Sequence, residues 1–121
     1  MSVLNRSAVA LVALVFTSLA STAQASPRDG ISVKRDVVEA YSSALYSAVF
    51  NGGEIANVEV VGDGNTDLDV FIYDEFGNRL ISDTRDTDYC GVYFTPGWTG
   101  RIFIRVTNLG PVHNNFTLRA W

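Results

Sequence analysis

The chain has 121 residues and a formal net charge of −4, from 13 acidic and 9 basic side chains. Nucleic-acid phosphates and anionic lipid headgroups require clustered Lys and Arg, so an acidic chain of this kind is not expected to bind either. With Cys90 as the single cysteine, an intramolecular disulfide is also excluded.

Residues 1–25 have the organisation of a secretory signal peptide. A short polar start with one positive charge precedes a continuous apolar run at 8–19, and small residues at Ala23 and Ala25 occupy the positions that a signal peptidase inspects. The apolar run is shorter than the roughly 20 residues of a membrane-spanning helix, and no basic cluster follows it. We therefore expect cleavage after Ala25, no stable membrane anchor, and export to the periplasm or the extracellular space.

The segment 26–42 is predicted to be an N-terminal lead, and its first part, Ser26–Lys34, is expected to be loose because it has little apolar content. The folded domain is expected to cover 43–121. An Asn-Gly-Gly turn signal after Phe50 favours a strand over Ser43–Phe50. A short helix or turn over Val37–Tyr41 stays an alternative, because apolar residues there also recur at helical spacing.

Alternation of apolar and polar residues predicts further short strands along the rest of the chain. The predicted strands are Ile55–Val61, Leu68–Asp74, Arg79–Ser82, Cys90–Thr95, Gly100–Asn108 and Asn115–Trp121. About seven short strands, each with one apolar face, indicate a β-sandwich or barrel, and a sandwich suits a chain of this size. The last strand should lie inside a sheet, because Phe116 and Leu118 would otherwise be exposed.

The sequence does not indicate an enzyme. His113 is the only histidine and lies in a loop rich in Pro and Asn. Cys90 is in phase with Val92 and Phe94, which predicts a small buried side chain rather than a partner for a histidine. The motifs of serine hydrolases, zinc proteases and phosphate-binding loops are absent from the sequence.

Two segments of the predicted domain contain distinctive short elements. Val60–Asn78 has Asp-Leu-Asp at its centre, and Phe94–Asn108 contains Pro-Gly-Trp-Thr-Gly. Over roughly Ser43–Trp121, they resemble the pre-peptidase C-terminal (PPC) domains of bacteria. The resemblance implies a jelly-roll-like β-sandwich, and together with the pattern above it predicts an all-β fold of about seven to eight antiparallel strands.

The resemblance also implies a biological setting. PPC domains are usually appended to secreted proteases and are often removed from them; relatives in bacterial collagenases bind collagen, and several bind calcium. In this sequence no protease precedes the domain, and we expect its own signal peptide to export it alone.

A cluster of oxygen-bearing side chains lies in and around the turn before the Leu68 strand. These side chains are the candidate metal ligands Asp63, Asn65, Asp67, Asp69 and Asp74. Their spacing partly echoes an EF-hand loop, but a leucine stands where that loop needs Gly and no flanking helices are predicted, so an EF-hand is excluded. Calcium in another geometry stays open, because hard cations take several oxygen ligands. Alternatively, the acids cap backbone amides of the turn, or Asp69 pairs with Arg79 or Arg105 across the sheet.

A second candidate site consists of aromatic side chains that point away from the aliphatic faces of their strands. They are Phe71, Tyr73, Tyr93 and Phe103. If these strands share one sheet, its outer surface carries an aromatic patch that is expected to bind a ligand. The alternative is that a loop or the N-terminal segment covers the rings.

Two functions follow from these features. The first is a secreted, non-catalytic binding module, with calcium as an open cofactor, that engages a protein, peptide or polysaccharide. The second is an accessory or inhibitory partner of a separate exported peptidase.

Overall fold

Strands form the regular structure of the chain in a computed structural model that describes residues 24–25 and 27–121. Eight of the described strands have five or more residues: β4 (Val33–Val38), β5 (Ser43–Phe50), β6 (Ile55–Val61), β7 (Leu68–Tyr73), β8 (Arg79–Asp83), β9 (Tyr89–Phe94), β10 (Gly100–Asn108) and β11 (Asn114–Ala120). The two-residue strands β2 (Gln24–Ala25) and β3 (Asp29–Gly30) precede them. Within the described residues, no helix is long and apolar enough to cross a membrane.

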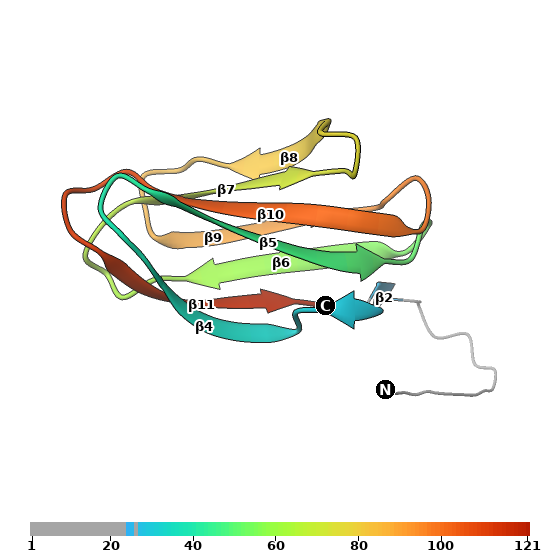
Figure 1. The fold of residues 1–121 in the computed structure, drawn as a ribbon, viewed down its shortest axis with the longest axis horizontal. Coiled ribbons are helices and arrows are strands. Elements are labelled where there is room, and N and C mark those ends of the chain that lie inside the picture. The colour runs from blue at the N-terminus through green and yellow to red at the C-terminus, as the bar shows by residue number, and fades with distance from the viewer. Residues whose placement is uncertain (1–23, 26) are drawn as a thin grey trace.

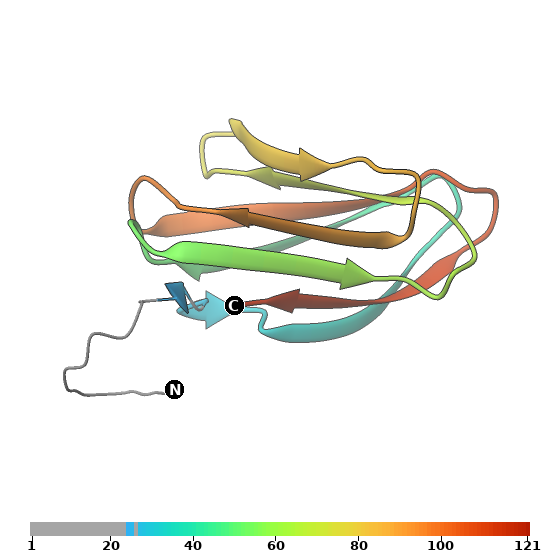
Figure 2. The same cartoon turned by 180° about the vertical axis from the view of Figure 1, so that it is seen from behind.

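The strands are arranged in two stacked sheets (Figure 1). The first, here called the β10 sheet, has the order β3-β5-β10-β7-β8. In the second, the β6 sheet, β6 lies between β9 and β11, and β4 is the outer neighbour of β11. Figure 2 shows β6 and β9 side by side from behind. The long strands all pair antiparallel, which confirms the predicted β-sandwich.

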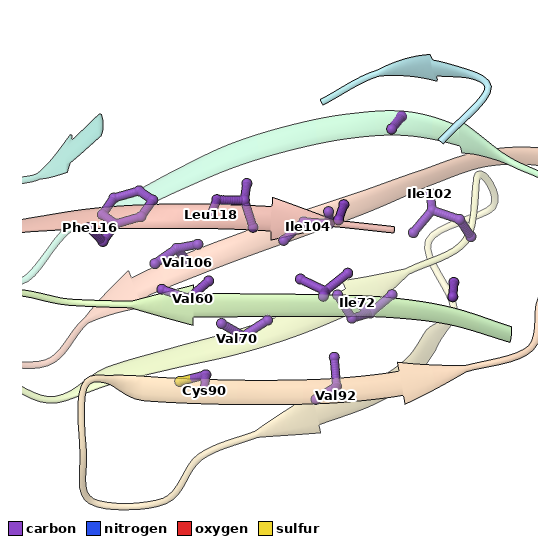
Figure 3. Packing of buried hydrophobic residues seen from close by; sticks show 14 of the residues in the cluster. Val60, Val70, Ile72, Cys90, Val92, Ile102, Ile104, Val106, Phe116 and Leu118 are labelled. Carbon is purple, nitrogen blue, oxygen red and sulfur yellow. The ribbon is translucent and has the colours of Figure 1, made fainter. Parts of the chain in front are cut away.

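The inward faces of the two sheets enclose one hydrophobic core. Figure 3 shows side chains of both sheets, among them Ile104 of β10 and Leu118 of β11, in the space between them. Neither of these two side chains has any exposed surface. Strand β11 lies between β6 and β4, so the expectation that the last strand is internal is confirmed.

The prediction that 26–42 is only a lead to the folded domain is wrong for Val33–Val38. These residues form β4, which pairs with β11 from Asn114 to Arg119. The hydroxyl of Tyr46 donates a 2.7 Å hydrogen bond to Oδ2 of Asp36 and so ties β4 to the opposite sheet. Charged residues within β4 hide its alternation, as is common for edge strands.

Of the alternative of a short helix or turn over Val37–Tyr41, the helix is wrong, whereas a turn does follow β4. Tyr41 has a φ of 54°, in the left-handed region that an α-helix excludes. The amide of Ser42 bonds to the carbonyl of Glu39, which closes a turn between β4 and β5. The chain crosses from one sheet to the other at this turn.

The predicted signal peptide, residues 1–25, lies outside the described residues except for β2. Gln24 and Ala25 pair in parallel with Ile55 and Ala56 at the start of β6. Cleavage after Ala25 would remove this pairing.

Candidate functional site

Asp63 acts as a cap in the turn after β6. Its Oδ1 accepts a hydrogen bond from the amide of Asn65 at 3.0 Å, and its Oδ2 accepts one from the amide of Asn115 at 2.9 Å. The bond from Asn115 is the main cause that lowers the pKa of this carboxyl. For Asp63, the structure therefore agrees with the capping alternative.

Asn114, the first residue of β11, is a buried residue that joins this turn to the β8–β9 loop, and the sequence reading did not single it out. Its side-chain oxygen accepts from the amide of Asp63 at 3.1 Å. Its side-chain nitrogen donates to Thr66 Oγ1 at 3.0 Å and to Asp88 Oδ2 at 3.1 Å. The position of the acidic turn thus depends on a side chain far away in sequence.

Asp74 lies at the other end of β7 and caps the β7–β8 turn. Its Oδ1 accepts from the amides of Phe76 and Asn78, each at 2.9 Å. At about 3.3 Å per residue, the length of β7 separates Asp74 from the acidic turn. Asp74 therefore belongs to a different turn from the other predicted metal ligands.

Asp67 and Asp69 are the two predicted ligands with unsatisfied oxygens. Each has a buried Oδ1 without a hydrogen-bond partner, and Asp69 is only 7% exposed. Burial is the main cause that raises the pKa of both carboxyls, and Asp86 adds electrostatic repulsion to each. Asp69 forms no ion pair with another described residue, so the alternative of pairing with Arg79 or Arg105 is not realised.

The five predicted metal ligands are therefore distributed over different environments. Asp63 is a cap, Asn65 donates its amide to that cap, and Asp74 lies at the opposite end of β7. Among the described residues, no group of three or more His, Cys, Asp and Glu side chains is placed to hold a metal ion. Asp67 and Asp69 are the side chains that a cation would neutralise, and calcium binding stays a prediction.

Three of the four predicted aromatic residues lie together on the outer surface of the β10 sheet. Phe103 of β10 is directly opposite Tyr73 of β7, and Arg105 is opposite Phe71. The guanidinium carbon of Arg105 lies 5.1 Å from the ring centre of Phe71 and 5.3 Å from that of Tyr73. Its Nη2 donates a 2.6 Å hydrogen bond to the hydroxyl of Tyr73.

A second arginine reaches one of these rings, that of Phe71, from the other side of β7. The guanidinium carbon of Arg79, on β8, lies 5.6 Å from the ring centre of Phe71. Phe71 therefore contacts arginines from both neighbouring strands, in cation–π geometry. We call the surface formed by Phe71, Tyr73, Phe103, Arg79 and Arg105 the arginine–aromatic face.

A shallow hollow of about 330 Å³ lies at the end of the arginine–aromatic face nearest the β7–β8 turn. Leu45, Tyr73, Phe103 and Arg105 line it, together with residues of that turn. Leu45 is 62% exposed and supplies apolar surface at its edge. Because Asp74 and Glu75 are among these turn residues, the hollow combines apolar walls with one guanidinium group and two carboxylates.

The prediction that Tyr93 shares this surface is wrong. Tyr93 lies on β9, opposite Asn57 of β6, and is therefore on the outer face of the other sheet. It is 71% exposed. Alternation correctly indicated that its ring points outward, but alternation carries no information about which sheet a strand joins.

Two further exposed aromatic residues lie in turns and were missed by the sequence reading. Phe76 in the β7–β8 turn is 74% exposed and Trp98 in the β9–β10 turn is 48% exposed. Their ring centres are 5.8 Å apart, and Trp98 Nε1 donates to Glu75 Oε2 at 2.8 Å. These turns lie at the same end of the sandwich (Figure 1). Aromatic residues at turn positions are the signal that could have identified them.

Cys90 is buried, as predicted, and its sulfur donates to the carbonyl of Leu68 at 3.0 Å. Burial raises the pKa of this thiol to about 12, which leaves it protonated and unreactive at neutral pH. His113 is exposed in the β10–β11 loop.

Comparison with known proteins identifies the fold. Neither protein-family models nor curated proteins match the chain. Among solved structures, the pre-peptidase C-terminal domain of collagenase from Bacillus anthracis is similar, with a TM-score of 0.59, 8% identity and coverage of 77% of this chain and 90% of that chain. PliG of Aeromonas hydrophila, a periplasmic inhibitor of g-type lysozyme, has a TM-score of 0.54, 10% identity and coverage of 78% and 89%.

A third similar structure is the Yersinia pseudotuberculosis-derived mitogen, with a TM-score of 0.54, 11% identity and coverage of 74% of this chain and 82% of that chain. At identities this low, the likeness concerns the fold and not the site. The chain therefore has a β-sandwich fold that resembles, in structure, a PPC domain.

Proposed function

We propose that the chain is an exported, non-catalytic binding module that engages a protein, peptide or polysaccharide through the arginine–aromatic face. The observation that carries the proposal is the gathering of three rings and two arginines on one outer sheet surface beside a hollow. Aromatic and Arg side chains are the types that ligand-binding surfaces concentrate, because they offer large contact areas and directed hydrogen bonds.

Export is part of the proposal. It is supported by the signal-peptide organisation of residues 1–25. At the level of fold only, it is in keeping with the likeness to a periplasmic inhibitor.

We also propose that a cation such as calcium binds at Asp67 and Asp69. The buried oxygens of these carboxyls have no hydrogen-bond donor, and their mutual repulsion is unfavourable when both are ionised. A cation would remove that cost and stabilise the turn that precedes β7. Its role would be structural, since the arginine–aromatic face lies further along the same sheet.

A second candidate function is inhibition or assistance of a separate exported peptidase. The exposed Phe76–Trp98 pair favours it, because two apolar rings at the tip of the sandwich have a shape that can enter an enzyme cleft. A fold-level analogy is the likeness to a lysozyme inhibitor. In this function the turns, rather than the sheet surface, would contact the partner.

Capture experiments with matched variants test the proposal. The immobilised domain is exposed to the exported proteins and to the matrix polymers of its source, and bound material is compared between wild type, Phe103→Ala and Tyr93→Ala. We expect Phe103→Ala to lose the bound ligand, whereas Tyr93→Ala, which removes a ring from the opposite sheet, retains it. Equal retention by wild type and Phe103→Ala would exclude the arginine–aromatic face. Loss on Phe76→Ala alone, with a peptidase as the captured protein, would favour the second function.

A further inference from the structure

Arg79 and Arg105 form no ion pair with a described residue, although the chain has an excess of acidic side chains. Two other arginines of the described residues are paired. Arg85 bonds to Asp83 at 2.6 Å, and Arg119 bonds to Glu59 at 3.2 Å. The arginine–aromatic face therefore presents positive charge on a protein that is negative overall.

Arg105 is held in place without an acidic partner. Its guanidinium lies against the rings of Phe71 and Tyr73, and Nη2 is fixed by the Tyr73 hydroxyl. Its Nε is buried without a hydrogen-bond partner, and Nη1 donates to no described residue. An arginine ordered in this way loses little further side-chain entropy when it binds an anion.

The hollow beside Arg105 provides an apolar surface within reach of this charge. Leu45 and Phe103 line it, and its volume of about 330 Å³ lies at the lower end of the range for ligand sites. Such a space suits one or two side chains of a longer ligand. Asp74 and Glu75 also line the hollow, but their carboxylates already accept hydrogen bonds, Asp74 from the amides of Phe76 and Asn78 and Glu75 from Trp98. A ligand that complements the whole face therefore places a carboxylate at the free guanidinium edges and a neighbouring apolar group in the hollow.

We infer that the arginine–aromatic face binds a peptide segment that carries a carboxylate. Arg105, assisted by Arg79, would donate hydrogen bonds to the carboxylate, and the hollow between Leu45 and Phe103 would take an adjacent apolar side chain. The inference rests on the proposed binding function and specifies its ligand class. Guanidinium groups bind carboxylates through paired, charge-assisted hydrogen bonds.

The geometry favours a peptide over an acidic polysaccharide. Sugar rings bind by stacking on open aromatic faces, but the rings of Phe71 and Tyr73 are already contacted by guanidinium groups. An acidic side chain is flexible and needs only the free edge of a guanidinium group. The apolar wall formed by Leu45 also suits an aliphatic side chain better than a hydroxylated sugar.

Calorimetric titration with defined probes tests the inference. The probes are a short capped peptide of Leu, Ser and Glu, the same peptide with Gln in place of Glu, and polygalacturonate. The proteins are wild type, Arg105→Gln, Arg105→Lys and Arg79→Gln. Arg35→Gln is the matched control, because Arg35 is exposed on β4 of the opposite sheet. Melting curves establish that each variant is folded.

We expect the Glu peptide to bind wild type and Arg35→Gln equally, and Arg105→Gln about tenfold more weakly. Arg105→Lys should also bind weakly, because an ammonium group lacks the planar fork. Raised salt should weaken binding to wild type, since the charges are partly exposed. If Arg105→Gln does not fold, Arg79→Gln is the test variant, because Arg79 is exposed. It should also weaken binding of the Glu peptide.

Three results would overturn the inference. Equal binding of the Glu and Gln peptides would mean that the face does not recognise the carboxylate, and would leave the binding-module proposal intact. Binding of polygalacturonate but of neither peptide would place the ligand in another class. If neither peptide nor polygalacturonate binds wild type, the inference fails, and the Phe103→Ala capture experiment then decides separately whether the face binds anything.

Discussion

The hydroxyl of Tyr73 accepts a 2.6 Å hydrogen bond from Nη2 of Arg105, while the guanidinium of the same arginine lies 5.3 Å from the Tyr73 ring centre. One tyrosine therefore holds one arginine through both its ring and its hydroxyl. The two residues come from neighbouring strands, β7 and β10, so sheet pairing sets this relationship.

Replacement of Tyr73 by Phe should separate these two contributions. The ring contact persists in Tyr73→Phe, but the hydrogen bond is lost, and the free energy of unfolding should fall by about 1 kcal/mol. Urea denaturation of Tyr73→Phe beside Tyr93→Phe measures the difference, because the Tyr93 hydroxyl forms no hydrogen bond with another described residue. A loss of the same size in both variants would show that the bond to Arg105 contributes nothing specific.

Calcium should raise the melting temperature of the wild-type domain relative to chelator. The reason is that a cation at Asp67 and Asp69 binds the folded state and not the unfolded chain, so the effect should grow with calcium concentration. Asp67→Asn removes one ligand charge and should abolish most of the shift. Asp63→Asn is the comparison, since Asp63 is occupied as a cap and its replacement should leave the calcium shift in place. Superimposable melting curves of the wild type in calcium and in chelator would show that calcium does not bind at Asp67 and Asp69.

Asp83 should make the stability of the domain decrease at acid pH. The Arg85 guanidinium, bound through Nε at 2.9 Å and Nη2 at 2.6 Å, lowers the pKa of Asp83 to about 2. Because the folded-state pKa is below the unfolded value of about 3.9, this stability is present above pH 3.9 and is lost as pH falls towards 2.

Asp83→Asn should remove that contribution, at a cost of roughly 1–2 kcal/mol at neutral pH, a figure reduced because Arg85 is largely exposed. The amide of Gly91 also donates to Asp83 at 3.0 Å, so the edge of β9 should loosen as well. Denaturation at several pH values measures the effect, and the stability difference between wild type and Asp83→Asn should shrink below pH 3.9. A difference that stays constant between pH 7 and pH 2 would contradict the assigned role.

Cys90 should be inert and should contribute to the core. Replacement by Ser introduces a more polar group into an apolar site, and should lower stability by about 1–3 kcal/mol. A bulky thiol reagent should label the native protein slowly and the unfolded protein rapidly. Fast labelling of native protein would mean that the region around β9 opens readily.

The alternation of side chains was sufficient to predict most strands and the direction of their faces. Leu68, Val70 and Ile72 point into the core as expected, because successive residues of a strand must point to opposite sides. The same rule, with the cost of exposing Phe116, predicted that β11 is internal. These features depend on local geometry and on burial of apolar surface, and both can be read from neighbouring residues.

Strand β4 was not predicted, because its own residues show little of this apolar alternation. Its edge position leaves Lys34 and Arg35 exposed, so little of its pattern is apolar. What makes it a strand is pairing with β11, which is distant in sequence.

Only the tertiary structure decided which side chains share a surface. Phe71 and Tyr93 have equivalent patterns in the sequence, yet β7 joins one sheet and β9 the other. In the same way, Asp63 became a cap because the amide of Asn115 reaches it, while Asp69 was left with a buried oxygen and no donor. Strand alternation specifies a direction for each side chain, but strand pairing between distant segments determines its neighbours, and those neighbours determine charge, burial and binding.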